Sequence, residues 1–95
     1  MKRPWTIASA AVLAAFLAAG CTSATALRNA RSSFEKAKTA GAESKAPYEY
    51  YAAEAYLGLA QHEADEGDRA GVREFAETSG KYSAEALQKA GGGAK

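Results

Sequence analysis

The sequence predicts an all-α protein, with a signal helix followed by a small antiparallel helical hairpin or three-helix bundle. Alanine is the dominant residue, and alanine favours helices because it loses no side-chain entropy on entering them. Beyond the first twenty or so positions, apolar residues recur at spacings of three and four, as on one face of a helix. Glycine or proline punctuates these stretches at Gly41, Pro47 and Gly67.

The first 21 residues have the three-part layout of a bacterial secretory signal. Lys2 and Arg3 form a positively charged start, and an uncharged, mostly apolar stretch covers residues 7–19. That stretch is too short for a stable membrane span, which needs about 20 apolar residues. We therefore expect residues 1–20 to be a signal peptide that is removed before Cys21.

The run Leu17-Ala18-Ala19-Gly20-Cys21 resembles the bacterial lipobox, although Ala18 stands where leucine is favoured. The resemblance implies that Cys21 is the lipid attachment site, with diacylglycerol on its thiol and usually an acyl chain on its new amine. Two or three acyl chains anchor a protein stably, because each buried methylene contributes about 0.8 kcal/mol. Thr22 follows the cysteine, where an aspartate would retain many Gram-negative lipoproteins in the inner membrane. In a Gram-negative cell, we therefore expect the mature protein at the periplasmic face of the outer membrane.

Residues 21–90 are predicted to form the helical domain, followed by a flexible tail over residues 91–95. Its helices are expected at about 24–40, 47–66 and 69–90, with a loop over residues 41–46. The first helix carries one narrow apolar stripe, made of Leu27, Ala30, Phe34 and Ala37.

The second helix is predicted to begin at Pro47, which suits a first helical position, and to end at Gly67. Helical periodicity places six apolar residues on the face expected to pack into the core: Tyr48, Tyr51, Ala52, Ala55, Tyr56 and Leu59. Tyr50 and Leu57 then point outward, and we interpret them as a possible partner-binding patch. The alternatives are that the tyrosines only pack the hairpin, or that they stack on a glycan.

The third helix is predicted to start after Asp68 as its N-cap. Its expected core face is Val72, Phe75, Ala76, Ser79, Tyr82, Ser83, Ala86, Leu87 and Ala90. Small residues, Ala55 among them, would let the second and third helices approach closely. Within the third helix, Glu77–Lys81 and Glu85–Lys89 have the spacing of helical ion pairs. Because large apolar residues are few, the domain would be marginal alone, which predicts an envelope protein partner or self-association.

The residues indicate neither catalysis nor a metal site. His62 is the only imidazole, and we interpret it as structural or solvated. The acidic residues around it lack the spacing of a calcium loop. No motif places a base beside a nucleophile, so we expect no enzyme activity and no cofactor other than the lipid on Cys21.

Charge argues against a nucleic-acid partner. Removing Lys2 and Arg3 leaves 10 basic and 11 acidic side chains, whereas phosphate binding needs a basic surface. The charge is also uneven, at net +3 over residues 21–47 and net −4 over residues 48–95. The basic first helix could lie against anionic lipid headgroups or could complement the acidic hairpin.

The segments Pro47-Tyr48-Glu49-Tyr50 and Ala55-Tyr56-Leu57, with the hairpin that follows, resemble an uncharacterised family of small alanine-rich helical bacterial lipoproteins. Members of that family are sometimes encoded beside, or fused to, OmpA-like peptidoglycan-binding domains. The resemblance implies an envelope location and no known catalysis. The hairpin also resembles a single tetratricopeptide-like unit, although its landmarks are about two residues too far apart.

These observations predict a membrane-anchored cell-envelope lipoprotein that acts as a non-catalytic interaction or assembly module. The alternative is a structural tether between outer membrane and peptidoglycan through Lys95. The murein lipoprotein also ends in a lysine that joins it to peptidoglycan, but this chain lacks that protein's long unbroken heptads.

Overall fold

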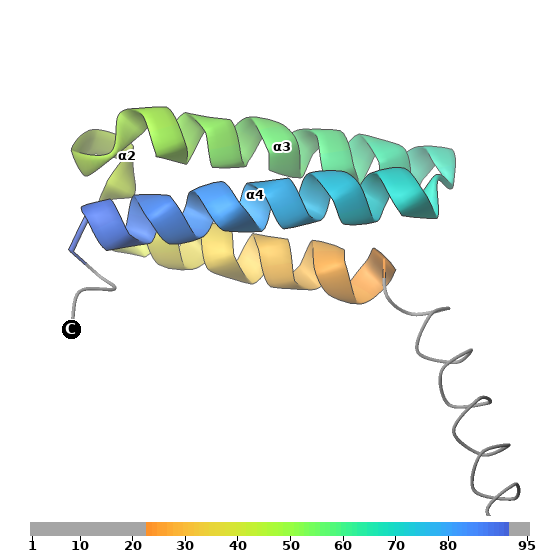
Figure 1. The fold of residues 1–95 in the computed structure, drawn as a ribbon, viewed down its shortest axis with the longest axis horizontal. Helices are drawn as coiled ribbons and strands as arrows, with labels where there is room; N and C mark the ends of the chain where they lie inside the picture. The colour runs from red at the N-terminus through yellow and green to blue at the C-terminus, as the bar shows by residue number, and fades with distance from the viewer. Residues whose placement is uncertain (1–22, 92–95) are drawn as a thin grey trace, which may run out of the picture.

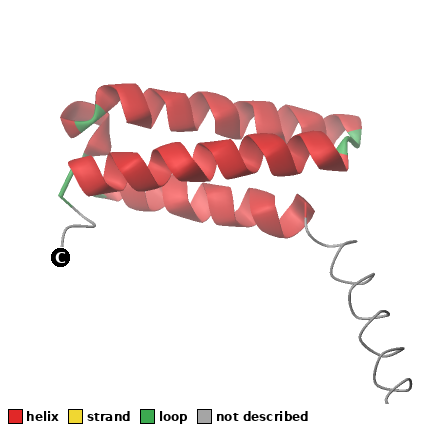
Figure 2. Ribbon diagram, viewed as in Figure 1, coloured by secondary structure: helices red, strands yellow, loops and turns green. Residues whose placement is uncertain are grey.

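A computed structural model describes residues 23–91, and these residues form helices joined by short turns, with no strand among them (Figure 2). A helix covers residues 23–39, followed by α2 (Ala42–Lys45), α3 (Pro47–Glu66) and α4 (Arg69–Lys89). The all-α class is therefore confirmed. The predicted signal peptide, the lipid attachment site Cys21 and the proposed tether residue Lys95 lie outside the described residues.

The first helix, α3 and α4 lie side by side as a three-helix bundle, and α2 closes one end of it (Figure 1). α3 and α4 form the predicted antiparallel hairpin. Gly67 ends α3 with a left-handed backbone, at φ 80°, and the Asp68 carboxylate accepts a 3.0 Å hydrogen bond from the Gly71 amide. The predicted bounds of α3 and the predicted cap of α4 are confirmed. Within residues 23–91, none of the helices has the length and hydropathy that crossing a membrane requires.

The predicted loop over residues 41–46 is wrong, because α2 occupies most of it. Gly41 reverses the chain with φ 83°, and its carbonyl accepts hydrogen bonds from the amides of Ser44 and Lys45. Ala42 and Ala46 are buried against α3 and the first helix. Burial of these two alanines holds the connection in a helical turn, an effect that local composition does not report.

Alanine fills the core of the described bundle, accounting for eight of its eleven buried apolar residues. The stripe predicted on the first helix is confirmed, since Ala30, Phe34 and Ala37 are buried and Leu27 packs against the core. One cluster surrounds Phe34 and Tyr50, and the other joins Ala30, Ala60 and Ala76. Small residues let helix axes approach closely, so the bundle is thin and has little room for large side chains.

The contact between α3 and α4 is made by small side chains. Ser79 is fully buried, and its hydroxyl donates a 2.7 Å hydrogen bond to the Ala53 carbonyl of α3. Ser83 and Ala86 are also fully buried, as predicted for the core face of α4. Ala55, predicted to share this contact, is exposed instead.

The orientation of α3 differs from the prediction. Of the six residues expected in the core, Tyr48, Tyr51 and Leu59 are 70%, 49% and 42% exposed. The buried face is instead Glu49, Tyr50, Ala53 and Ala60, with Leu57 packed against both clusters. α3 is apolar on two sides, and the side that carries Ala53 and Ala60 is the one small enough to approach its neighbours.

The two buried serines of α4, Ser79 and Ser83, provide a test of the contact between α3 and α4. We expect Ser79→Ala to lower the free energy of unfolding by about 1 kcal/mol, because it removes a satisfied buried hydrogen bond. Ser83→Ala is the matched control: the Ser83 hydroxyl is buried without a hydrogen-bond partner, so its removal should be neutral or stabilising. Urea denaturation measures both, and equal losses in the two variants would contradict the assignment.

Candidate interaction surface

Among the described residues, the exposed large apolar side chains all lie along α3. We define the outer face of α3 as Tyr48, Ala52, Ala55 and Leu59, of which Ala52 is half-buried and the other three are exposed. Tyr51 borders this face, and its hydroxyl donates a 2.7 Å hydrogen bond to the Glu43 carboxylate of α2. Contiguous exposed apolar side chains on a small protein mark interaction sites more often than isolated ones do.

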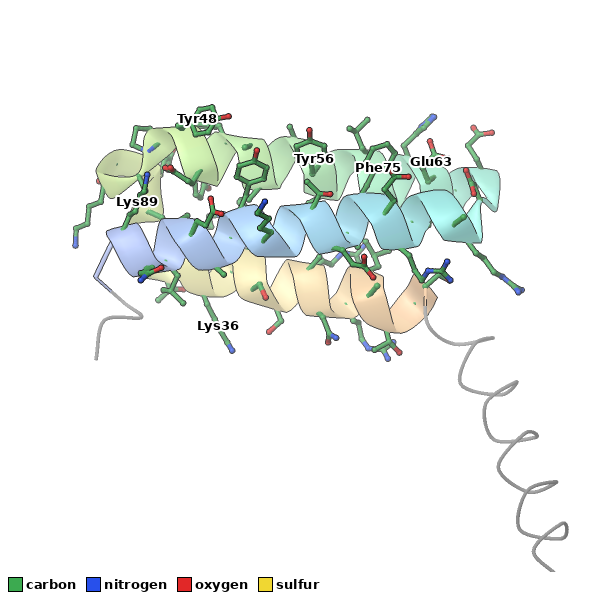
Figure 3. The ribbon with its side chains drawn as sticks, viewed as in Figure 1. Lys36, Tyr48, Tyr56, Glu63, Phe75 and Lys89 are labelled. Atoms are coloured by element: carbon green, nitrogen blue, oxygen red, sulfur yellow. The ribbon has the colours of Figure 1, made fainter. Side chains whose placement is uncertain are left out.

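A row of four aromatic rings runs beside this face along the seam of α3 and α4. We define the aromatic row as Tyr48, Tyr82, Tyr56 and Phe75, in the order of their contacts. The ring of Tyr82 lies 6.1 Å from that of Tyr48, edge to face, and 5.8 Å from that of Tyr56, with which it is nearly parallel. Tyr56 lies 6.2 Å from Phe75. In Figure 3 the labelled Tyr48, Tyr56 and Phe75 lie along α3 and this seam.

The aromatic row holds the hairpin together from outside. Aromatic pairs at these separations contribute about 0.5–1.5 kcal/mol each beyond burial of their area. The neighbouring Tyr48 hydroxyl raises the pKa of Tyr82 above its usual range, and partial burial adds to this shift. The rings are therefore ordered by one another and still reach solvent, since Tyr56, Phe75 and Tyr82 are only half-buried. An ordered aromatic surface loses little side-chain entropy when it binds a partner.

An ion pair clamps the hairpin at the Tyr48 end of this surface. The Lys89 ammonium near the end of α4 donates to the carboxylate of Glu49, which is only 8% exposed. This contact lowers the pKa of Glu49 and raises the pKa of Lys89. It is the ion pair that forms among the described residues, so the predicted helical pairs Glu77–Lys81 and Glu85–Lys89 are wrong.

Tyr50 and Leu57, the residues predicted to bind a partner, do not lie on this surface. Tyr50 is 3% exposed, its ring packs 5.0 Å from that of Phe34, and burial raises its pKa. Leu57 is half-buried between the two core clusters. Their outward orientation was therefore wrong. Tyr50, Ala53, Leu57 and Ala60 have the spacing of a second helical stripe, so the sequence offered the correct core face as one of two alternatives.

The other sequence candidates stay apart from the outer face of α3. His62 is exposed on α3, and within residues 23–91 no group of three potential metal ligands lies together. Glu63 lies beside Asp68, a contact that raises the pKa of Glu63, while the Gly71 amide lowers the pKa of Asp68. The Asp68 carboxylate caps the start of α4, and Glu63 lies beside that cap near the end of α3, so their proximity has a structural explanation.

These features define a small helical bundle that leaves one apolar helix face uncovered. Residues 25–92 match the profile of a family described as a domain of unknown function (DUF4398). The chain therefore belongs to the DUF4398 family. The match covers every helical residue that the structure describes except residues 23 and 24. No curated protein matches the chain, and no solved structure does.

The clamp predicts a stability window in pH. The ordinary pKa of a glutamate is 4.5, and in the folded chain Glu49 lies below it. The contribution of Glu49 to the free energy of unfolding is thus present above pH 4.5, and it is lost as pH falls through the lowered pKa. The pKa of Lys89 lies above its ordinary 10.5, so its contribution is present below that pH and is lost as pH rises through the raised pKa.

We expect Glu49→Gln to lower the thermal midpoint at pH 7 and to flatten its decline in acid. Glu77→Gln is the control, because Glu77 is an exposed carboxylate of α4 that makes no ion pair among the described residues. Thermal unfolding followed by circular dichroism between pH 2 and pH 8 measures both variants. A Glu49→Gln curve parallel to wild type at every pH would contradict the role of the clamp.

Proposed function

We propose that this protein is a lipid-anchored cell-envelope lipoprotein whose helical domain is a non-catalytic interaction module. The observation that carries the proposal is the outer face of α3, where Tyr48 and Leu59 are large, apolar and exposed on a helix whose opposite side already fills the core. A helix that is apolar on both sides is normally covered on both sides. The uncovered side is therefore the binding surface of the module.

The aromatic row extends this surface from α3 onto α4. Tyrosine and phenylalanine are enriched in the centres of protein interfaces, because a rigid ring buries much area at small entropic cost. Here Tyr82 and Phe75 place such rings beside the outer face of α3. An exposed apolar and aromatic helix face of this kind suits another protein surface better than a small ligand, which favours concave sites.

The anchor is supported by the sequence. A charged start, an apolar stretch, small residues and Cys21 occur in the order of a lipoprotein signal. Acylation of Cys21 would place the first helix, which is described from residue 23, directly beside the membrane surface. In a Gram-negative cell the proposed location is the periplasmic face of the outer membrane.

Intact mass of the membrane fraction tests the anchor. We expect the wild-type chain expressed in a Gram-negative host to yield a species that starts at Cys21 and carries acyl chains, and Cys21→Ala to yield none. An uncut chain, or a free thiol at Cys21, would reject the lipoprotein assignment. A peptidoglycan fragment on Lys95 would favour the tether over the interaction module.

Photo-crosslinking in intact cells tests the interaction surface. We expect a photoreactive amino acid at Leu59 to give one discrete protein adduct, because Leu59 is a large, exposed apolar residue of the proposed contact. The same photoreactive amino acid at position 84 is the control. Ala84 is exposed on α4, and its position in the helix lies away from the contact with α3. Equal labelling from the two positions, or none from Leu59, would reject the outer face of α3 as a binding surface.

A further inference from the structure

The outer face of α3 has the spacing of a coiled-coil seam. Tyr48, Ala52, Ala55 and Leu59 follow one another at intervals of four, three and four residues, which is the alternation of the two core positions of a heptad. Tyr48 touches α4 at one edge, through the ring of Tyr82, but the core of the bundle takes Tyr50, Ala53, Leu57 and Ala60 from the other side of the helix. α3 thus carries two apolar stripes, and within the described chain only one of them is buried, while Tyr48, Ala55 and Leu59 of the other stay exposed.

The outer face of α3 is complementary to a second copy of itself that runs in the opposite direction. It has large side chains at its ends and alanines in its middle. Two copies of α3 that run antiparallel place Tyr48 of each against Leu59 of the other, and Ala52 of each against Ala55 of the other. The alanines allow close approach at the centre, and the larger side chains cover the ends. A parallel arrangement would bring Tyr48 against Tyr48 and would lose this match.

Charge favours the same orientation. Lys45, in α2 just before α3, and Glu66, the last residue of α3, are exposed at opposite ends of the seam. Neither forms an ion pair among residues 23–91. Antiparallel pairing brings the α2 end of each copy, which carries Lys45, to the end of α3 that carries Glu66 in the other, so the attraction occurs twice. Parallel pairing would instead bring like charges together at both ends.

We propose that the partner of the outer face of α3 is a second copy of this chain, bound antiparallel about a two-fold axis. This inference rests on the proposed function, because it names the partner of that same surface. Such a contact is isologous, so it closes as a dimer and does not propagate into a fibre. With the two-fold axis along the membrane normal, both copies lie along the bilayer and the two proposed anchors at Cys21 enter the same leaflet.

Disulfide trapping in the envelope tests the pairing with the full chain. Ala52→Cys and Ala55→Cys are co-expressed on copies with different tags, because the proposal places these two positions opposite each other within disulfide range. We expect a heterodimer carrying both tags on a non-reducing gel. The matched controls are Ala84→Cys copies and the unaltered chain, whose one cysteine is Cys21. Equal trapping in either control would overturn the proposal.

Charge reversal tests the orientation. We expect Lys45→Glu to lower the trapped yield about fivefold, since two exposed attractions become repulsions. The further substitution Glu66→Lys on the same chain should restore the yield, because both symmetric contacts are then attractive again. A double variant that traps no better than Lys45→Glu would overturn the antiparallel arrangement. A different protein bound at this surface would give no such rescue.

The trapping and photo-crosslinking results together separate the two proposals. An adduct of Leu59 with a different protein, without a trapped heterodimer, overturns the second copy as partner and leaves the interaction module intact. Absence of both the adduct and the heterodimer rejects the surface itself, and with it the proposed function. A tagged heterodimer that contains both engineered cysteines supports both.

Discussion

The close approach of α3 to α4 is the constraint on which the rest of this structure depends. Ser79 reaches the Ala53 carbonyl at 2.7 Å, and no large side chain stands between the two helices at that point. Such proximity gives many weak contacts to small atoms, which together replace the bulky core of a larger protein. It also removes the interior space in which tyrosines would otherwise pack. Apart from Tyr50, which packs on Phe34, the aromatic side chains of the hairpin thus lie along its outside.

The outer position of these aromatic side chains explains how a marginally stable bundle keeps its shape and also presents a surface for binding. The aromatic row joins α3 and α4 at the seam, while the clamp between Glu49 and Lys89 fixes one end of the hairpin. The same rings that stabilise the hairpin remain half-exposed, so part of their apolar area is still available for burial. A domain of this size gains proportionally more from an interface than a large one, because its own core is small.

The family match assigns the chain to a group defined by sequence and not by activity. The feature of this chain that points to a function is the apolar outer face of α3, whose heptad spacing reads the same in both directions. An antiparallel pair and an acyl anchor would be related physically. Anchoring confines copies to a surface and raises their effective concentration, so even a weak contact between outer faces of α3 can be populated. A thin bundle with an uncovered seam is suited to that situation.

Local signals in the sequence determined the helices of this protein. Pro47, Gly67 and Asp68 act on their own backbone neighbours, so the bounds of α3 and the start of α4 follow from them directly. The stripe of the first helix was also readable, because that helix has only one apolar side. The loop before α3 was not, since α2 is held by burial of Ala42 and Ala46 against distant residues.

Which side of α3 is buried was decided by the tertiary structure alone. Periodicity gives two apolar stripes for α3, and the larger tyrosines favoured the wrong one. The choice depends on how closely α4 can approach, and on Lys89, which neutralises the charge that Glu49 brings into the interface from forty residues away. A sequence shows that a helix is apolar on two sides, but only packing against its neighbours determines which side remains free to bind.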